Sequence, residues 1–384
     1  MKRIVTTPRA DWKQKVESVG LAWHTAKGDY WNESAYYSFT LAEITKIENA
    51  TNTLHELCLQ AAQHVITKKL YDKLHIPKSM VPMIEASWAN DVPSLYGRFD
   101  FVFNGIGEPV MLEYNADTPT SLVEAALAQW HWLQEKFPGK DQFNSLHERL
   151  IGLWKYLKPY LQGDLLHLVS LDDVEDGMTV AYIRDCAEQA GIHTDQLLIS
   201  DIGVTEDGFF VDLENRVIEC CFKLYPWEWL ANEKFAPTLT KIGARMQWIE
   251  PTWKMILSNK GILPILWELN EGHPNLLAAS FDSIETVMWE AYVKKPILSR
   301  EGAGVTVTLF DQTLAETGTQ GYGEEGYIYQ ALASVPNFDG NRPIVGSWAI
   351  GHEEGNVAGG MGVRESSSLI TDNMSRFVPH VIED

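Results

Sequence analysis

The stretch that decides the fold is Arg98–Ser121, which reads RFDFVFNGIGEPVMLEYNADTPTS. It contains two runs of strand-forming residues, FDFVF and PVMLEYN, separated by a short loop with two glycines, and this pattern predicts a β-hairpin. Side chains on a strand alternate between its two faces. The hairpin therefore places Asp100 opposite Glu113 and Arg98 opposite Asn115 on one face.

Two carboxylates that face each other across a hairpin repel, and some other group must compensate. A divalent cation is one such group. Two carboxylates and an amide form an oxygen ligand set that suits Mg²⁺, which in proteins often also holds phosphate oxygens. An acidic, solvated hairpin face explains the same pattern about equally well. With Gly105–Glu108 as the loop, this register also pairs Asn104 with Pro109.

Length and composition describe a folded, acidic chain. Its 384 residues exceed one ordinary core and predict roughly two or three subdomains. The formal charge of -21 argues against a nucleic-acid surface, because phosphate backbones are bound by clustered Lys and Arg. No apolar run is long enough for a signal peptide or a membrane span, and the four cysteines lack CxxC spacing. We therefore expect a cytoplasmic protein with no nucleic-acid or membrane partner.

Three segments show a helical pattern. Leu41–Leu74 repeats apolar residues at three- and four-residue steps and predicts a long scaffold helix that ends before Pro77. After the hairpin, Ser121 with Glu124 three residues later predicts a capping box and a new helix. The positive end of that helix points at the hairpin and favours anion binding there. A further helix is expected around Ser145–Leu161.

Residues 165–201 predict a strand–helix–strand unit, built from LLHLVSL, an amphipathic segment and LLISD. Glu175 and Asp176 belong to an acidic cluster after its first strand, where open α/β sheets bind ligands. Helix capping is the simpler explanation for each carboxylate alone, and binding of a cationic amine is the functional one. Residues 208–225 predict a second hairpin, whose two adjacent cysteines are buried packing residues.

The portion from about Trp253 alternates β-branched or aromatic runs with glycine turns, which predicts an antiparallel sheet. REGAGV, at residues 300–305, follows Lys294 and Lys295. Glycines let backbone N–H groups approach phosphate oxygens, and lysines add positive charge. The loop matches neither GxxxxGK[ST] nor GxGxxG, so a plain turn also explains it. The glycines around Arg364 leave room for a ligand beside it.

These features together indicate an enzyme that activates a substrate with ATP. A metal and cations neutralise phosphate charge during transfer, while a glycine-rich loop closes over the phosphates. Paired carboxylates also suit glycoside hydrolysis, but that reaction leaves the basic, glycine-rich C-terminal portion without a role.

The chain resembles the synthetase domain of glutathionylspermidine synthase and its acid–amine ligase relatives, an ATP-grasp family. The resemblance extends over nearly the whole chain and is carried by GRFDFVF, MLEYNADTPTS, SNKGILPILWEL, YVKKPILSREGAGV, GYIYQ and RESSSLIT. It implies an α/β (α+β) fold of ATP-grasp type with an inserted Rossmann-like (pre-ATP-grasp) segment, and no amidase domain. The expected parts are residues 1–159 with the N-terminal helices and metal-binding hairpin, 160–230 as the Rossmann-like substrate segment, and 231–384 with the C-terminal ATP-grasp subdomains and the phosphate loop.

The resemblance implies that ATP phosphorylates a carboxylate and that an amine attacks the acyl phosphate, giving an amide, ADP and phosphate. ATP is then a substrate, Mg²⁺ the cofactor, and the partners are a peptide-like carboxylic acid and an amine such as a polyamine. The alternative is an ATP-binding pseudo-ligase that works as a sensor or scaffold.

The resemblance also assigns residues by position. Asp100, Glu113 and Asn115 are the expected metal ligands, and Arg98 is the expected catalytic residue, which stabilises the acyl phosphate and the tetrahedral intermediate. The expected ATP-binding set is Arg98, Phe99, Asp100, Lys260, Lys295, Glu301, Gly302, Gln330, Ala331, Leu332, Ala333, Arg364, Leu369, Ile370 and Thr371.

Four residues stand at positions that bind the acid substrate in the family: Thr118, Thr120, Glu175 and Asp176. Two positions depart from the family pattern. Leu224 stands where the glutathione-binding members carry a hydroxyl residue, and Asn373 stands where they carry a basic one. These departures argue against glutathione itself as the acid and leave the ATP chemistry untouched.

Overall fold

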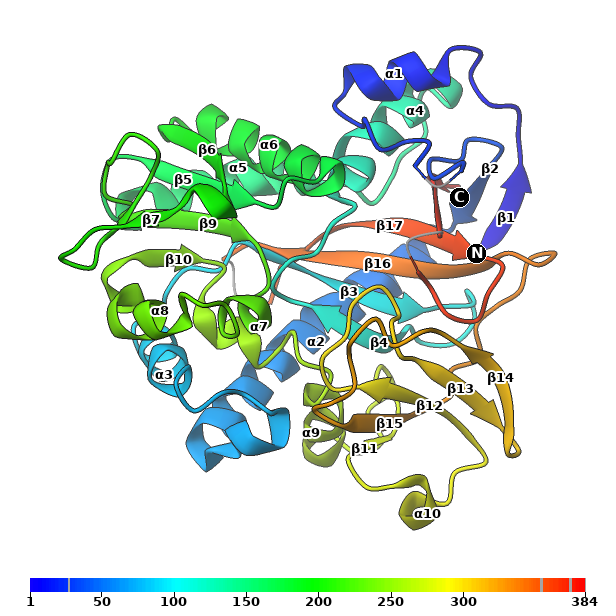
Figure 1. Cartoon of the computed structure of the whole chain (residues 1–384). Helices are drawn as coiled ribbons and strands as arrows, with labels where there is room; N and C mark the ends of the chain where they lie inside the picture. The colour runs from blue at the N-terminus through cyan, green and yellow to red at the C-terminus, as the bar shows by residue number, and fades with distance from the viewer. Residues whose placement is uncertain (27, 353–354, 373–374, 384) are drawn as a thin grey trace.

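A five-stranded antiparallel sheet in the order β18-β17-β16-β3-β4 lies at the centre of the fold (Figure 1). The structure is a computed structural model that describes residues 1–26, 28–352, 355–372 and 375–383. Two segments far apart in the sequence build the central sheet, because β3 pairs with β16. Its strands are β3 (Tyr96–Val102), β4 (Val110–Asn115), β16 (Arg342–Ile350), β17 (Ala358–Ser366) and β18 (Arg376–Val378).

The predicted hairpin is formed by β3 and β4. Asp100 pairs with Glu113 and Arg98 with Asn115, which confirms the register predicted for this end of the hairpin. Both pairs lie on the same face of the sheet, since the residues of each strand are two apart.

The register at the loop end of the hairpin was predicted wrongly. Phe101 pairs with Met111, so a β-bulge at Leu112 shifts the pairing by one residue, and the ladder ends at the pair Val102–Val110. The predicted pair of Asn104 with Pro109 therefore does not form. The side chain of Asn104 instead accepts hydrogen bonds from two backbone N–H groups of the loop.

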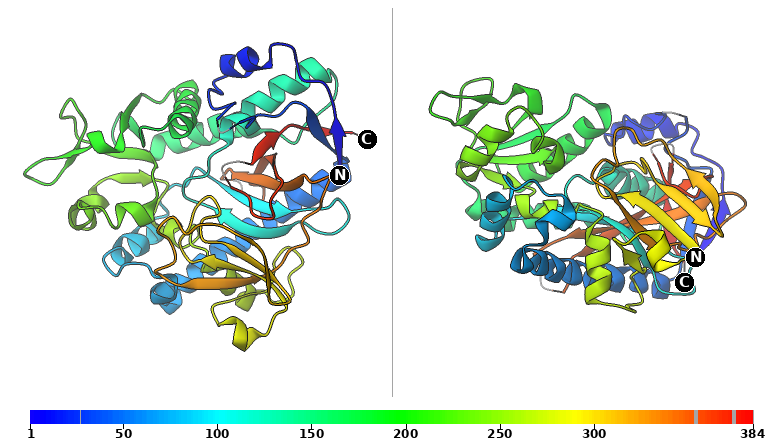
Figure 2. Two further views of the ribbon diagram at one scale, coloured as in Figure 1. Left: turned by 45° about the vertical axis from the view of Figure 1, so that its right-hand side comes forward. Right: turned by 60° about the horizontal axis from the view of Figure 1, so that its bottom comes forward.

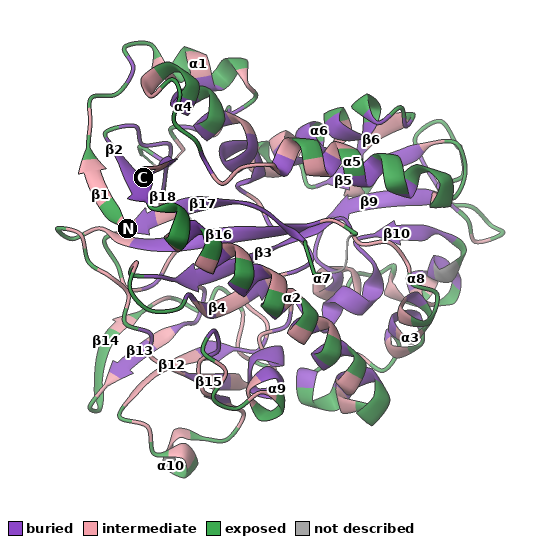
Figure 3. Cartoon of the chain, turned by 180° about the vertical axis from the view of Figure 1, so that it is seen from behind, coloured by how far each residue is buried: buried purple, intermediate pink, exposed green. Residues whose placement is uncertain are grey.

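Helix α2 (Leu41–Lys68) lies across the back of the central sheet (Figure 3). It begins with a capping box in which the Thr40 hydroxyl and the Glu43 carboxylate each accept a backbone N–H. Its apolar stripe is buried against β16 and β17, as its period predicts. The helix ends earlier than expected, at Lys69 in the left-handed region, and a 3₁₀ turn over Leu70–Leu74 follows.

A four-stranded parallel sheet forms a second layer, in the order β10-β9-β5-β6. The predicted strand–helix–strand unit is confirmed as β5 (Leu166–Ser170), α6 (Val174–Gln189) and β6 (Thr194–Leu198). The predicted second hairpin forms only in part: Val211 pairs antiparallel with Val217, but the strand that carries the cysteines has other partners. Cys220–Leu224 (β9) pairs in parallel with β5 and with β10 (Gln247–Ile249). Its two cysteines are fully buried, because β9 is an inner strand covered on both faces.

A second five-stranded antiparallel sheet has the order β11-β15-β12-β13-β14. The C-terminal strands were expected to form one sheet, and this expectation is wrong, because β16 and β17 belong to the central sheet. Helix α9 (Ile262–Leu269) packs beside β11 and β15. The strands are β11 (Ala279–Ser280), β12 (Ala291–Pro296), β13 (Thr306–Leu309), β14 (Gln312–Glu316) and β15 (Tyr327–Ala331).

The helix after the hairpin begins after Ser121 and has a π-helical segment, Glu124–Ala128, before α4 (Gln129–Lys136). The predicted capping box is wrong. Ser121 has φ +68° and its hydroxyl lies 3.1 Å from the Tyr30 hydroxyl, while the carboxylate of Glu124 is fully buried in the core. The next helix, α5 (Leu146–Leu157), is confirmed within the expected range.

Both ends of the chain belong to one small sheet, β1-β2-β19, and lie on the same side of the molecule (Figure 2). Among the described residues, no helix combines the length and the apolar character needed to cross a lipid bilayer. The expected α/β (α+β) class is confirmed by these elements, and the division at residues 160 and 230 stays a prediction. The remaining elements are β1 (Lys2–Val5), β2 (Ala35–Phe39), β19 (His380–Ile382), β7 (Gly203–Val204), β8 (Phe210–Val211), α1 (Trp12–Ser18), α3 (Val81–Ala89), α7 (Trp227–Leu230), α8 (Ala236–Ile242) and α10 (Ile284–Val287).

Candidate active site

A cleft of about 460 Å³ is lined by the central sheet, the second antiparallel sheet and the carboxyl ends of β5 and β9. It gathers residues from positions 23 to 372 of the chain. All of the predicted site residues except Phe99 line this cleft. The Phe99 ring is fully buried and stacks on Tyr114 at 3.9 Å between ring centroids, because it points to the opposite face of β3 from Arg98 and Asp100.

The three expected metal ligands lie together on the cleft face of the hairpin. The side-chain Nδ2 of Asn115 lies 3.3 Å from a carboxylate oxygen of Asp100 and 3.4 Å from one of Glu113. Turning the amide by 180° about its terminal bond presents Oδ1 to the same point. Three oxygen donors then converge, which is the chemistry that Mg²⁺ requires. The residues therefore fit the ion.

Arg98 is held in one position by three hydrogen bonds. Its Nε and Nη2 donate to the two carboxylate oxygens of Asp100, at 2.7 and 3.2 Å, and its Nη1 donates to the Thr120 carbonyl oxygen at 2.7 Å. The side chain lies across Gly346 of β16, where an added Cβ would stand 2.9 Å from Cδ of Arg98. A glycine is needed at this position so that the arginine can lie flat on the sheet.

Two lysines face the hairpin from the other side of the cleft. Lys260 Nζ lies 3.2 Å from a Glu113 carboxylate oxygen, and Lys295 Nζ donates to the Leu112 carbonyl oxygen and to Gln330 Oε1, at 3.0 and 2.7 Å. Burial alone would raise the pKa of Glu113, but the two lysines outweigh it and lower that pKa. Burial lowers the pKa of Lys295 to about 8. The β-bulge at Leu112 is what presents a carbonyl to Lys295.

The far end of the cleft is a narrow apolar space between the two antiparallel sheets. The predicted segment Gln330–Ala333 forms one edge, as β15 ends and the chain crosses to the central sheet. Sequence reasoning missed the apolar side chains that cover this space, because single β-branched residues on separate strands give no local signal. They are Leu112, Val293, Val305, Val307, Val335 and Ile344.

The glycine-rich loop joins β12 to β13 and contacts the segment at residues 369–371. Gly302 has φ +71°, and an added Cβ would stand 2.7 Å from the Thr371 carbonyl oxygen. Arg300, which was noted in the sequence only for its place beside the glycines, donates to the Thr118 hydroxyl at 2.6 Å. It also pairs with Glu228 of α7 at 2.8 Å. One arginine therefore connects the loop, Thr118 and helix α7.

Glu175 and Asp176 lie in the first turn of α6 at the other end of the cleft. Asp173 is the N-cap, and one of its oxygens accepts the backbone N–H groups of both residues. Burial, with repulsion from Asp173 and Glu175, raises the pKa of Asp176 to about 7. Burial also raises the pKa of Glu175. Leu224, at the end of β9, lines the same end of the cleft.

The glycines near Arg364 have a different role from the one expected. Arg364 does line the cleft, where its Nη2 donates to Asp100 at 2.8 Å. A Cβ at Gly362 would collide with the Phe377 ring, and one at Gly360 would press on residues before α5. These glycines make room for protein packing and not for a ligand. The other family departure, Asn373, lies outside the described residues.

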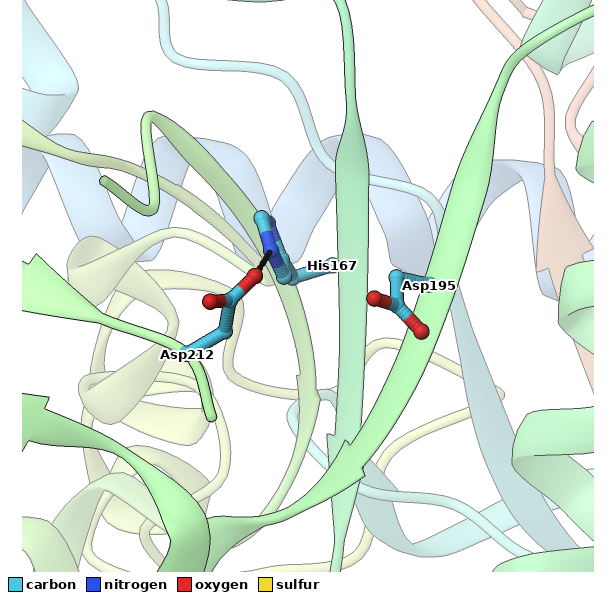
Figure 4. A group of neighbouring side chains, drawn as sticks. All are labelled: His167, Asp195 and Asp212. Carbon is cyan, nitrogen blue, oxygen red and sulfur yellow. Dashed lines mark hydrogen bonds and ion pairs between the residues drawn. The ribbon is translucent and has the colours of Figure 1, made fainter. Parts of the chain in front are cut away.

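A separate cluster on the parallel sheet has the composition of a metal site (Figure 4). His167 Nε2 lies 3.1 Å from a carboxylate oxygen of Asp212, and potential ligand atoms of these two residues and Asp195 lie within 4.8 Å of one another. Arg216 pairs with both carboxylates, at 2.6 Å from Asp212. One guanidinium thus offsets part of the charge of the two carboxylates.

Comparisons with known proteins match nearly the whole chain. The model of the family described as "Glutathionylspermidine synthase preATP-grasp" matches residues 3–383. A protein of Haemophilus influenzae described as "Putative acid--amine ligase" is 43% identical, with 99% of both chains covered. The "Bifunctional glutathionylspermidine synthetase/amidase" of Escherichia coli is 27% identical over 97% of this chain, and the "Trypanothione synthetase" of Crithidia fasciculata is 28% identical over 84%. The chain spans 63% and 53% of the lengths of these last two relatives.

Proposed function

This chain belongs to the glutathionylspermidine synthase preATP-grasp family, and on that premise we propose that it is an ATP-dependent ligase that joins a carboxylic acid to an amine through an acyl phosphate. The observation that carries the proposal is that one cleft holds three oxygen ligands, several cations and a narrow apolar space. A nucleoside triphosphate bound through a divalent cation needs all three of these features.

ATP is proposed to lie with its base in the apolar space beside Gln330–Ala333. Its phosphates then extend toward Lys295 and Lys260, and the loop over residues 300–304 covers them. Asp100, Glu113 and Asn115 would hold Mg²⁺. That ion, when bound, neutralises the charge on the phosphate oxygens. The buried lysines supply positive charge from the opposite wall of the cleft.

The proposed reaction has two steps. A carboxylate oxygen of the acid attacks the γ-phosphorus, and the bond from this phosphorus to the bridging oxygen of ADP breaks. The amine nitrogen then attacks the acyl carbon, the bond to the phosphate oxygen breaks, and the proton of the amine leaves with the phosphate. Arg98 is fixed in advance by Asp100 and Thr120, so it stabilises the developing negative charge without reorganising.

The acid is proposed to be peptide-like and to bind at Thr118, Thr120, Glu175 and Asp176. The relatives named above as glutathionylspermidine and trypanothione synthetases support an acid of this type and an amine such as a polyamine. Clustered carboxylates in a chain with a formal charge of -21 also suit a polycation.

Replacing the metal ligands tests the proposal. Asp100→Ala and Glu113→Ala should each lower Mg²⁺-dependent ADP release in the presence of acid and amine by about a hundredfold or more, since each removes an interaction with the reacting phosphates. Glu108→Ala on the same hairpin is the matched control, because its side chain is 46% exposed and outside the cleft. Unchanged turnover in the two cleft variants would contradict the proposal.

An ATP-binding protein without ligase activity is the second candidate. The family departure at Leu224 favours it, because the substrate end of the cleft has changed while the ATP end has kept its residues. Mass spectrometry of products from a panel of peptides and polyamines separates the two. An amide product establishes the ligase, and ATP binding with no product from any pair establishes the alternative.

A further inference from the structure

The substrate end of the cleft lies where the topology of the parallel sheet reverses. After β5 the chain places β6 on one side, and it then returns to place β9 on the other side. In open α/β sheets, ligands bind at the carboxyl ends of the two strands that flank such a point. Leu171 directly follows β5 and Leu224 ends β9, and both line the cleft. A substrate bound here therefore lies against two leucines.

Three further apolar side chains, Trp23, Pro226 and Trp229, line the same cleft. Together with Leu171 and Leu224 we call them the apolar wall. The Arg300 guanidinium lies 5.7 Å from the Trp229 ring centroid and is already bound by Glu228 and Thr118. None of the five wall side chains has a carboxyl, hydroxyl or amide group. The indole N–H groups of Trp23 and Trp229 are the polar atoms of the wall. A polar substituent pressed against Leu171, Leu224 or Pro226 loses its hydrogen bonds to water and regains none from these side chains.

The cleft that contains the apolar wall also contains two acidic side chains. Glu175 and Asp176 line the same cleft from the first turn of α6. The charge of Arg364 lowers the pKa of Glu175, and that of Arg300 lowers the pKa of Asp176. The ion pairs of these two arginines, however, are with Asp100 and Glu228. Burial, with repulsion from the carboxylates of Asp173 and Glu301, raises the pKa of both carboxyl groups. The positive charge of a bound ligand would offset this effect.

We infer that the acid substrate carries, besides its reacting carboxylate, an ammonium group that binds Glu175 and Asp176 and an apolar side chain that packs on the apolar wall. This inference rests on the proposed ligase function and names the substrate class of the same site. A short peptide with a free amino group and an apolar residue has this chemistry. A peptide with a second carboxylate does not, because the acidic turn repels that group and the arginine beside the wall, Arg300, is already bound by Glu228 and Thr118. Leu224 is the residue that selects the apolar side chain.

Three dipeptides test the inference on the wild-type protein: leucylglycine, glutamylglycine and N-acetyl-leucylglycine. Hydroxylamine replaces the amine, so that any acyl phosphate is trapped as a hydroxamate and the identity of the natural amine does not matter. With Mg²⁺ and ATP, kcat/KM for hydroxamate formation should be at least about tenfold higher for leucylglycine than for either of the others. ADP release is measured in parallel.

The outcomes separate the inference from the function on which it rests. Hydroxamate formation that is equal for the three dipeptides, or fastest with glutamylglycine, overturns the inference and leaves the ligase intact. No acid-dependent ADP release with any of the three, or with a wider panel of peptides, overturns both. A preference for leucylglycine over both others supports the inference.

Leu224→Thr tests the selecting residue. The ratio of kcat/KM for leucylglycine to that for glutamylglycine should fall by about tenfold, mainly through KM for leucylglycine. A loss of folded protein lowers both values equally and leaves this ratio unchanged, so the ratio reports specificity alone. Leu213→Thr is the control, because that leucine is 71% exposed and outside the cleft. An unchanged ratio in Leu224→Thr would show that Leu224 does not select the acid.

Discussion

The carboxyl group of Glu124 is fully buried, and the Tyr30 hydroxyl interacts with it. The side chain has no solvent exposure and belongs to the π-helical segment that follows Ser121. The Tyr30 hydroxyl and the Arg98 charge favour the ionised carboxylate, whereas burial and the charge of Glu175 disfavour it. Burial raises its pKa from the ordinary value of 4.5 to about 7. π-helical turns inside helices are frequent at functional sites.

Glu124→Gln should therefore stabilise the protein at alkaline pH. The folded carboxyl group keeps its proton up to about pH 7, whereas the unfolded one loses it near pH 4.5. The free energy of unfolding of the wild type consequently falls as pH rises through this window, by up to about 3 kcal/mol for this group. An amide does not titrate. Urea unfolding at pH 5 and pH 8 measures the difference between the two proteins.

Glu148→Gln, on the exposed face of α5, is the control for this pH dependence. It should leave both the stability and its slope with pH unchanged. Asp176, whose pKa is also raised to about 7, keeps part of the slope in every variant, so the comparison uses the difference from wild type. A Glu124→Gln protein with the pH slope of the wild type would mean that the buried carboxyl group is ionised.

For single residues, the sequence predicts those positions that follow from the alternation of side chains along a strand. Asp100, Glu113 and Asn115 could be placed together because a short loop and a period of two define which side chains share a face. Trp23 and Leu171 could not be placed in the cleft. They come from separate segments, and nothing local distinguishes them from ordinary core residues. Leu224 was noticed only through the family resemblance, since a strand-end leucine has no signal of its own.

Among the elements, the glycine-rich loop depends most on one backbone position. Gly302 has φ +71°, and a Cβ added to it would stand 2.7 Å from the Thr371 carbonyl oxygen. Gly302→Ala should raise KM for ATP by about tenfold while the protein stays folded, because the loop must move away from the segment at residues 369–371 and both line the proposed nucleotide site. ADP release measures KM, and thermal unfolding checks the fold.

Gly318→Ala is the matched control for this loop. Gly318 follows β14, has open space where a Cβ would stand, and has no left-handed φ. It should keep the wild-type KM for ATP. If the two alanine variants behave alike, the close approach of Gly302 to Thr371 has no part in nucleotide binding.

The elements also show where sequence patterns are ambiguous. An apolar run such as residues 218–224 suits both the inner strand of a hairpin and a buried parallel strand, because in both cases the residues are strand-forming. The partner decides between them, and here it is β5, which precedes β9 by some fifty residues. In the same way, β16 and β17 could be recognised as strands but not assigned to the sheet of β3.

At the scale of the whole molecule, buried ion pairs connect the parallel sheet to the central sheet. Lys223 of β9 lies 2.5 Å from Asp117, and both side chains are fully buried. The second oxygen of Asp117 accepts the backbone N–H of Trp227 at 2.9 Å. Asp117 immediately precedes Thr118, which lines the cleft. The ion pair therefore holds the substrate end of the cleft against the hairpin that carries the proposed metal ligands.

Lys223→Met should lower the free energy of unfolding by about 3–5 kcal/mol, because it leaves the Asp117 carboxylate buried without a counter-charge. Adding Asp117→Asn should restore much of the loss, since the amide carries no charge and its oxygen still accepts the Trp227 N–H. Urea unfolding followed by tryptophan fluorescence measures both, with Lys241→Met on exposed α8 as the control. A double variant as unstable as the single one would mean that Lys223 acts through packing. The apolar contacts of β9, and not the Lys223–Asp117 ion pair, would then hold the parallel sheet against the central sheet.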